Sequence, residues 1–378
     1  MNKHYVSFDG VYDDGETYFI SSGSFNGMLN YNKKDSTIEY VTSFQNQEPY
    51  QGGLHHKVYK YEDNLVFTPN NAKGIHIYDT KHKKMYFHKL FGTDEIRTRC
   101  IDALLVEDKL WLFFAYAEKP VVIFDLNTYE IKYFYGIIEK LPMDIRERKL
   151  QIFWCPMAKH REIVCGAIWN TSYIVKINMI TQQVELCNVG EAHRGLSTLA
   201  YDGMNFWFAR LRDTSVYKWN EKDNEIIEYE PLDFLDDEVF IYNNIICEHG
   251  QVLVIPNKGK KLLCVDEKEK KILEYCSLPD SFAEFADIRK TYRRFYDYDV
   301  INSVIRLFPA NANMMVEVDV EKKISVGTTI MLDVDDDENY KKHVLYRYMD
   351  IIQKKGIITK SNIIGLKEYL GYLTCDRS

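Results

Sequence analysis

A short phrase that recurs seven times along the chain constrains the fold more than any other feature. One copy, IHIYDTKHKKMYFH (75–88), is an apolar alternation that ends at Asp79, followed by a polar gap and a second alternation. Asp or Asn suits the end of the first strand because its side chain accepts a hydrogen bond from the backbone two residues on. The phrase therefore predicts a β-hairpin with a solvated tip. The strand-ending residues, called anchors below, are Asn32, Asp79, Asp125, Asn178, Asn220, Asp266 and Asp319.

The spacing of the anchors, about 42 to 53 residues, is the length of a propeller blade. An apolar residue follows six positions after the anchor in six copies, whereas Ile324 comes one position early in the seventh. Further short strands precede each hairpin. Each repeat unit is therefore predicted to form four antiparallel strands. A single unit cannot bury both of its faces, and closing units into a ring protects the sheet edges. We therefore expect an all-β, seven-bladed β-propeller of four-stranded blades, with a pair of β-sandwiches or an open β-solenoid as alternatives.

The propeller is assigned to residues 1–333 and a short C-terminal helical tail to residues 334–378. In the segment ENYKKHVLYRYMDIIQKKG, apolar residues recur at helical spacing, and a second short helix is predicted to begin at Ser361. The segment HYVSFDG (4–10) can supply the innermost strand of the first blade. Because the last blade looks complete by about residue 331, no strand exchange that closes the ring is evident.

The repeat pattern resembles seven-bladed propellers of the broad NHL, YVTN and Kelch kind over roughly residues 4–331. Motifs that would fix a family are missing: no recurring Gly-His and Trp-Asp pair of WD40 proteins, one double glycine at Gly52-Gly53, and no aspartate box of sialidases. The resemblance implies the architecture alone, and it supplies neither a catalytic residue nor a cofactor.

Composition and charge exclude several classes of partner. The net charge of −8 argues against nucleic acid, and no apolar run reaches the length of a membrane span. The eight cysteines form no C-x-x-C pair and no secretory signal is visible, so we expect buried, reduced thiols in a cytoplasmic protein. Adjacent strand residues point to opposite faces, so His55 and His56 do not predict a metal site.

Cations and asparagines gather in the segments that a propeller places around one mouth of its channel. These are the links between blades and the links between the second and third strands of a blade, which together form the top face. Arginine suits carboxylate or phosphate, and asparagine both donates and accepts hydrogen bonds. The predicted ligand-binding residues are His55, Asn70, Arg97, Arg99, His193, Arg194 and Arg210.

These observations favour a non-catalytic binding or scaffold propeller. Its top face would hold an anionic small molecule, a glycan or a peptide, and its C-terminal helices would contact a protein partner. The alternative is a lyase or hydrolase that acts at the channel mouth, in the manner of the antibiotic-linearising propeller lyases. His193 and His55 have no carboxylate partner at a regular spacing, so no catalytic residue is assigned.

Overall fold

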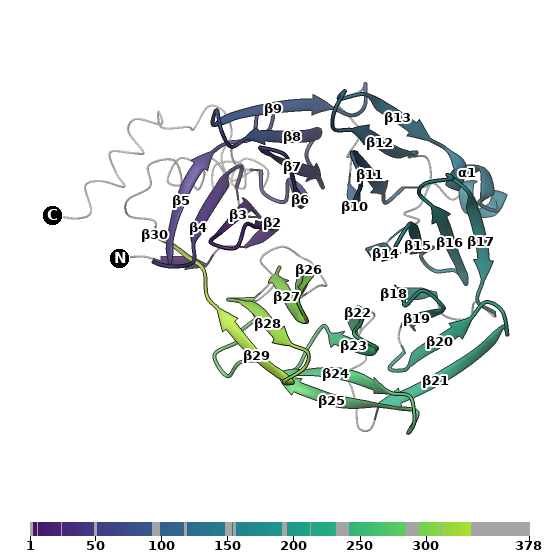
Figure 1. Ribbon diagram of the computed structural model, residues 1–378. Coiled ribbons are helices and arrows are strands. Elements are labelled where there is room, and N and C mark those ends of the chain that lie inside the picture. The colour runs from purple at the N-terminus through teal and green to yellow at the C-terminus, as the bar shows by residue number, and fades with distance from the viewer. Residues whose placement is uncertain are drawn as a thin grey trace, which may run out of the picture.

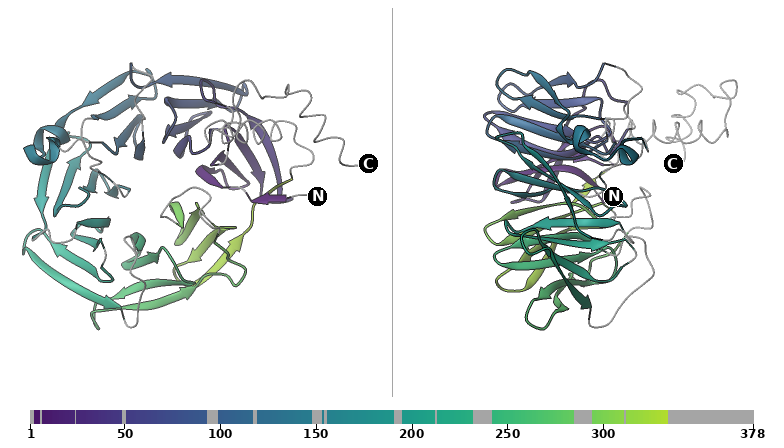
Figure 2. Two further views of the ribbon diagram at one scale, coloured as in Figure 1. Left: turned by 180° about the vertical axis from the view of Figure 1, so that it is seen from behind. Right: turned by 90° about the vertical axis from the view of Figure 1, so that its right-hand side faces the viewer.

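The computed structural model describes residues 3–5, 7–23, 25–48, 51–92, 99–116, 119–147, 153, 156–190, 195–211, 213–231, 242–284, 294–310 and 312–333. Within these ranges the chain forms a ring of β-sheets around a central channel (Figure 1). Seen from the side, the ring is a disc about one strand-length thick (Figure 2). The predicted all-β propeller of four-stranded blades is confirmed.

Each blade contains four antiparallel strands, and the first in sequence lies innermost (Figure 1). Blades 1 and 2 are β2 (Phe8–Asp13), β3 (Thr17–Ser22), β4 (Met28–Asn32), β5 (Thr37–Thr42), and β6 (His55–Tyr61), β7 (Asn64–Pro69), β8 (Gly74–Asp79), β9 (Lys84–Lys89). Blades 3 and 4 are β10 (Cys100–Val106), β11 (Lys109–Phe114), β12 (Val121–Asp125), β13 (Ile131–Phe134), and β14 (Ala158–His160), β15 (Ile163–Ala167), β16 (Tyr173–Asn178), β17 (Val184–Asn188). Blades 5 and 6 are β18 (Leu196–Tyr201), β19 (Asn205–Arg210), β20 (Val216–Asn220), β21 (Glu225–Pro231), and β22 (Tyr242–Glu248), β23 (Gln251–Pro256), β24 (Lys261–Asp266), β25 (Lys271–Ser277). Blade 7 is β26 (Phe295–Ile301), β27 (Val304–Pro309), β28 (Met315–Asp319) and β29 (Ile324–Thr328).

Five of these blades are separate four-stranded sheets, while blades 5 and 6 join into one eight-stranded sheet. The outer strands β21 and β25 pair in parallel, with Glu230 opposite Lys271 and Pro231 opposite Ile272. Two short helices, α1 (Gly136–Lys140) and α2 (Met143–Glu147), lie in the link between blades 3 and 4. No helix in the described ranges is long and apolar enough to cross a membrane.

Hydrophobic clusters fill the seams between blades, so the core is a ring of interfaces rather than a single centre. Each of seven buried clusters combines residues from two neighbouring blades. One of them joins the first blade to the last, with the rings of Phe8 and Phe308 at a centroid distance of 6.4 Å. The ring is therefore closed by the same kind of packing that joins consecutive blades.

All seven anchors end the third strand of a blade, as the sequence predicts. In each blade the anchor side chain accepts a hydrogen bond from the backbone N–H two residues on, at N···O distances of 2.9 to 3.1 Å. The residue four positions after the anchor has a positive φ in every blade, and none of the seven is a glycine. They are Ser36, Lys83, Tyr129, Gln182, Asn224, Lys270 and Lys323.

The outer hairpin of blade 7 differs from the others by one residue of register. In six blades, the apolar residue six positions after the anchor lies opposite the residue before the anchor. In blade 7, Ile324 instead lies opposite the anchor Asp319 itself. A one-residue slip turns a side chain to the other face of a sheet. Ile324 and Val326 are accordingly 49% and 58% exposed.

A small additional sheet joins the two ends of the ring. Strand β1 (Lys3–Tyr5) pairs antiparallel with β30 (Met331–Asp333), which follows the last blade. The sequence-based expectation that residues 4–10 form one innermost strand was wrong in detail, because that strand is β2, from Phe8 to Asp13. The pairing of β1 with β30 was also not predicted from the sequence. The predicted helical tail, 334–378, lies outside the described residues and stays a prediction.

Candidate functional site at the channel mouth

His55, the first predicted ligand contact, lies in the seam between blades 1 and 2. Its side chain is fully buried; Nδ1 lies 2.8 Å from Oγ of Ser21 and Nε2 lies 2.9 Å from Nδ1 of His76. Burial lowers the pKa of His55 well below its usual value, and the neighbouring His76 lowers it further. With both ring nitrogens engaged, His55 is placed in the core, and it leaves the set of proposed ligand contacts.

Asn70, Arg99 and Arg210 are half-buried at the top ends of blades 2, 3 and 5. The guanidinium carbon of Arg210 lies 4.3 Å from the ring centroid of Tyr217, whose hydroxyl donates to Asp213 at 2.8 Å. Arg210 thus packs against a local aromatic ring whose hydroxyl is bound to an acidic residue.

Arg97, His193 and Arg194 lie outside the described residues. The expected convergence of the predicted arginines across the mouth therefore stays a prediction.

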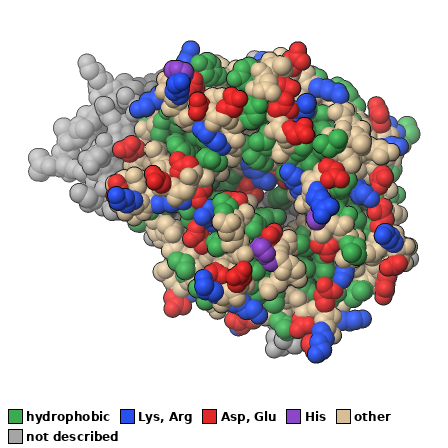
Figure 3. All heavy atoms as spheres, viewed as in Figure 1, with side chains coloured by type: hydrophobic (Ala, Val, Ile, Leu, Met, Phe, Trp, Pro, Cys, Tyr) green, Lys and Arg blue, Asp and Glu red, His purple; other side chains and the backbone are tan. Residues whose placement is uncertain are grey.

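A charged group that the sequence did not single out joins three innermost strands at the channel. Nζ of Lys57 on β6 lies 2.8 Å from Oδ1 of Asp102 on β10 and 3.9 Å from Oδ1 of Asp297 on β26. The Lys57 side chain is 21% exposed, Asp297 8% and Asp102 0%. We call these three residues the channel cluster. Looking along the ring axis, Figure 3 shows acidic and basic side chains side by side around the central hollow.

Each residue of the channel cluster lies at or next to a register irregularity near the start of its strand. The register of β10 shifts between Cys100 and Asp102, and that of β26 shifts between Phe295 and Asp297. A bulge of this kind inserts an extra residue and redirects the following side chains. In β6 the irregularity is larger, and the hydroxyl of Thr68 accepts from the backbone N–H of Lys57 at 2.8 Å. Similar shifts occur in β2, β18 and β22, so they belong to the repeat.

Blade 1 has a glycine where the inner strand of blade 2 comes close to it. Gly10 occupies the position after the bulge in β2, and a Cβ atom there would lie 3.1 Å from Cγ2 of Val58. Blades 2 and 7, which lie on either side of blade 1, also touch each other: the Tyr296 hydroxyl of blade 7 donates to the backbone oxygen of His56 in blade 2. Because blades 2 and 7 are not adjacent, their inner strands make contact at the channel itself.

Burial and neighbouring charges shift the pKa values of Lys57 and Asp297 in the channel cluster. Burial opposes the charge on Lys57, but Asp102 and Asp297 together raise its pKa well above the usual value. Burial raises the pKa of Asp297 to about 7, although Lys57 acts in the opposite direction and Asp102 adds to the increase. Asp102 is held by backbone donors as well, since it accepts from Ala103 at 2.7 Å and Met157 at 2.8 Å. The cluster therefore combines a cation that stays charged with a carboxyl group that titrates near neutrality, and the Asp102 side chain is held in place by hydrogen bonds.

Sequence signals for the channel cluster exist, but they are weak. Asp102 interrupts the otherwise apolar run CIDALLV, and Asp297 lies in FYDYDVI at the same place in its blade. A charge inside an apolar strand indicates a paired or functional group. Such a signal does not reveal the partner, because Lys57, Asp102 and Asp297 are far apart in sequence.

The described part of the chain contains no candidate metal site, and neither Cys187 nor Cys276 is an activated cysteine. None of its His, Cys, Asp and Glu side chains form a group of three or more that could hold a metal ion. Six cysteines in these ranges are unpaired thiols. Burial raises the pKa of Cys187 to about 12 and of Cys276 to about 11, which makes both poor nucleophiles.

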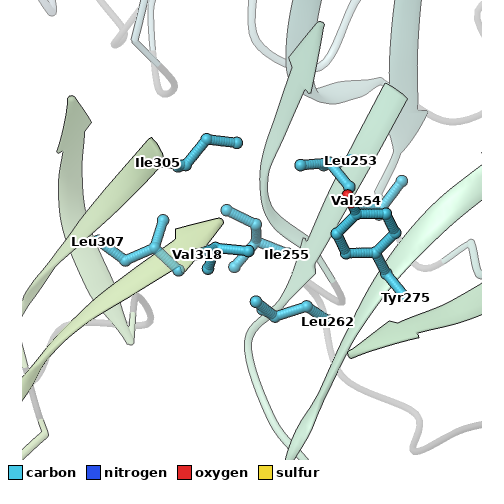
Figure 4. Close-up of a pocket in the computed structure, with 8 residues that line it drawn as sticks. All are labelled: Leu253, Val254, Ile255, Leu262, Tyr275, Ile305, Leu307 and Val318. Carbon is cyan, nitrogen blue, oxygen red and sulfur yellow. The ribbon is translucent and has the colours of Figure 1, made fainter. Parts of the chain in front are cut away.

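An apolar cavity of about 10 Å³ lies between blades 6 and 7 (Figure 4). Its lining consists of Leu253, Val254, Ile255, Leu262, Tyr275, Ile305, Leu307 and Val318. Ligand pockets are typically at least about 300 Å³, and a space of this size barely holds one water. The cavity is therefore a packing defect of the seam rather than a binding site.

Comparisons with known proteins define the fold and leave the function open. No family model and no curated protein matches the sequence. Virginiamycin B lyase from Staphylococcus aureus is similar in structure, with a TM-score of 0.56, 12% identity, and coverage of 82% of this chain and 96% of that chain. The extracellular domain of a putative one-component system from B. thetaiotaomicron gives 0.52 and 11%, covering 81% of this chain and 38% of that one. U3-55K gives 0.53 and 9%, covering 80% and 88%. These likenesses establish a β-propeller fold shared by proteins of different function.

Proposed function

We propose that this chain is a seven-bladed, non-enzymatic binding propeller whose ligand enters the channel at the top face and contacts the channel cluster. The observation that carries the proposal is the ion pair of Lys57 with Asp102, extended to Asp297 across three inner strands. Apolar residues already fill the seams, and a buried ion pair is often no more stabilising than apolar packing. Strongly perturbed charges that converge on a channel are a mark of functional sites.

The ligand classes under this proposal are an anionic small molecule, a glycan and a peptide. Arg97, Arg99, Arg194 and Arg210 would provide an outer ring of positive charge that attracts an anionic group to the mouth. Replacing Arg99 and Arg210 together by glutamate tests this role. We expect slower association with an anionic ligand and a stronger salt dependence in the wild type.

The direct test is a thermal-shift screen of anionic sugars, nucleotides, neutral glycans and acidic peptides against the full chain and its Lys57→Met variant. A ligand of the channel should raise the melting temperature of the wild type but not of the variant. Lys60→Met is the matched control, because Lys60 lies on the same strand β6 and is exposed. Hits that stabilise all three proteins equally would place the binding site elsewhere.

A propeller-type lyase or hydrolase is the second candidate, and one observation favours it. The Asp297 carboxyl group, with a pKa of about 7 beside Lys57, has the acidity expected of a general acid or base at neutral pH. If the protein is an enzyme, mass spectrometry should detect turnover of a hit from the screen, and Asp297→Asn should abolish it while leaving binding in place.

A further inference from the structure

The charge balance of the channel cluster narrows the class of ligand. The Lys57 ammonium lies within 4 Å of an oxygen of each of two carboxyl groups, so the group has no excess positive charge. An anionic group would meet Lys57 but also Asp102 and Asp297. A cationic group would meet the two carboxylates but also Lys57. A hydroxyl group avoids both conflicts, because it donates to a carboxylate and accepts from an ammonium at the same time.

Hydrogen-bond capacity remains in the cluster. An ammonium group offers three donors, and Lys57 has Asp102 at hydrogen-bonding distance, whereas Asp297 at 3.9 Å is too far. The Asp297 carboxylate accepts from the backbone N–H of Tyr298. Two neighbouring hydroxyl groups of a ligand could satisfy both sides, one accepting from Lys57 and the other donating to Asp297.

Aromatic rings on the same inner strands offer flat apolar surface beside the charges. Tyr59, Tyr296 and Tyr298 are half-buried on β6 and β26. The hydroxyl of Tyr59 donates to the backbone oxygen of Ala103, and that of Tyr296 to the backbone oxygen of His56. Both rings pack partly against the apolar seam clusters and are half-buried, so only their remaining exposed edges could add apolar contact for the C–H face of a sugar ring.

We propose that the channel cluster binds a neutral, hydroxyl-rich ligand of the carbohydrate class, with Lys57 and Asp297 contacting adjacent hydroxyl groups. This inference rests on the proposed binding function and specifies its ligand. Asp102 acts as a positioning residue that fixes the Lys57 ammonium.

The pH dependence of binding by the wild-type protein distinguishes a neutral ligand from an anionic one. The titratable and charged groups that interact with Asp297 are Lys57 and Tyr59 on β6, Asp102 on β10, and Tyr298 and Asp299 on β26. Lys159 on β14 acts on the same group through Lys57 and Asp102. When Asp297 gains a proton between pH 8 and pH 6, it loses a charge-assisted hydrogen bond but still donates and accepts. Affinity for a neutral sugar should fall about fivefold, since such a bond is about twice as strong as a neutral one. Affinity for an anion should rise instead.

The experiment is a glycan array probed with the labelled full chain, followed by titration calorimetry at pH 6 and pH 8. We expect binding to neutral glycans that is weakened several-fold in Asp297→Asn, lost in Lys57→Met, and unchanged in Asp223→Asn, a change in an exposed turn of blade 5. Should Asp297→Asn fail to fold, the pH profile of the wild type decides the same question.

Two results would overturn the carbohydrate assignment in different ways. If acidic sugars or nucleotides bind in a Lys57-dependent manner, more tightly at pH 6, the ligand class is wrong and the proposed binding function stands. If no glycan binds, or glycans bind the wild type and both cluster variants equally, the assignment fails. In that case the Lys57→Met thermal-shift screen decides separately whether the channel binds any ligand.

Discussion

At the scale of single residues, Asp102 shows how a fully buried charge is retained inside the ring. Both oxygens of its carboxylate have partners: Oδ1 contacts the Lys57 ammonium and the backbone N–H of Ala103, and Oδ2 accepts from the backbone N–H of Met157. Removing one partner of a buried pair leaves the other charge uncompensated, which typically destabilises a protein by about 3–5 kcal/mol. We therefore expect Asp102→Ala to lower the free energy of unfolding by about that amount. Urea denaturation measures it, with Asp223→Ala in an exposed turn of blade 5 as the near-neutral control.

The buried pair His55 and His76 predicts a stability that declines in acid. Burial lowers the pKa of His76 to about 4, and that of His55 lies well below the usual 6.5. Both side chains stay neutral in the folded protein, while the unfolded chain takes up protons below about pH 6.5. Their contribution to stability is therefore complete above pH 6.5 and is lost as the pH falls from 6.5 towards 4.

Chemical denaturation at pH 7.5, 6.5, 5.5 and 4.5 tests this dependence. The variant His76→Gln should be less stable at pH 7.5 but lose less free energy of unfolding over the same range. Parallel curves for the two proteins would contradict the assignment of the acid sensitivity to this pair.

At the scale of elements, each outer hairpin has a non-glycine residue with a positive φ in its turn, and glycine at that position should stabilise the fold. Lys83 has a φ of 55° in the turn of blade 2. A left-handed backbone is unfavourable by about 1–2 kcal/mol for a residue with a Cβ atom, whereas glycine adopts it freely at an entropic cost of about 0.5–1 kcal/mol. Lys83→Gly should thus raise the free energy of unfolding by up to about 1 kcal/mol. Lys81→Gly, in the same turn but outside the positive-φ positions, should lower it.

The hairpins also show which features a sequence reveals. The anchors were predictable because their chemistry is local: an Asp or Asn bonds to the backbone two residues away, and the alternation restarts after a turn of fixed length. The channel cluster was not, because Lys57, Asp102 and Asp297 meet through ring closure and bulged strand starts. His55 illustrates the same limit. Alternation alone could not decide which neighbour in HHKVY faces the channel, and the irregular start of β6 gives that place to Lys57.

At the scale of the whole molecule, one arginine adds an ion pair across the seam between blades 7 and 1. Arg306 on β27 pairs with Asp13 of blade 1 and, at 2.8 Å, with Glu317 of its own blade. Lys33 adds a second cation beside Asp13. Arg306→Met should leave Asp13 and Glu317 undercompensated, so we expect a loss of a few kcal/mol in unfolding free energy.

A scanning-calorimetry comparison with Arg146→Met, an exposed change in α2, measures this loss. A melting temperature equal to that of the control would mean that apolar packing alone closes the ring.

The C-terminal tail provides a separate prediction. Deleting residues 338–378 should leave the propeller folded, because the described residues already form an apolar cluster in each of the seven seams. We expect lower solubility or the loss of a protein partner, since the apolar residues of the predicted helices need a surface to cover them. Circular dichroism and sedimentation of the truncated chain test this expectation. An unfolded product would show that the tail contributes to the closed ring.

The closing pair of strands also determines how the molecule would respond to a pulling force. Lys3 lies directly opposite Asp333, and Tyr5 lies opposite Met331, so both chain ends leave the pair at the same side. Tension applied through the two ends therefore loads one end of the short ladder and breaks its hydrogen bonds one after another instead of all together. The ring should open first at this point, at low force. The remaining blades should then detach in order, starting from whichever side of the seam yields.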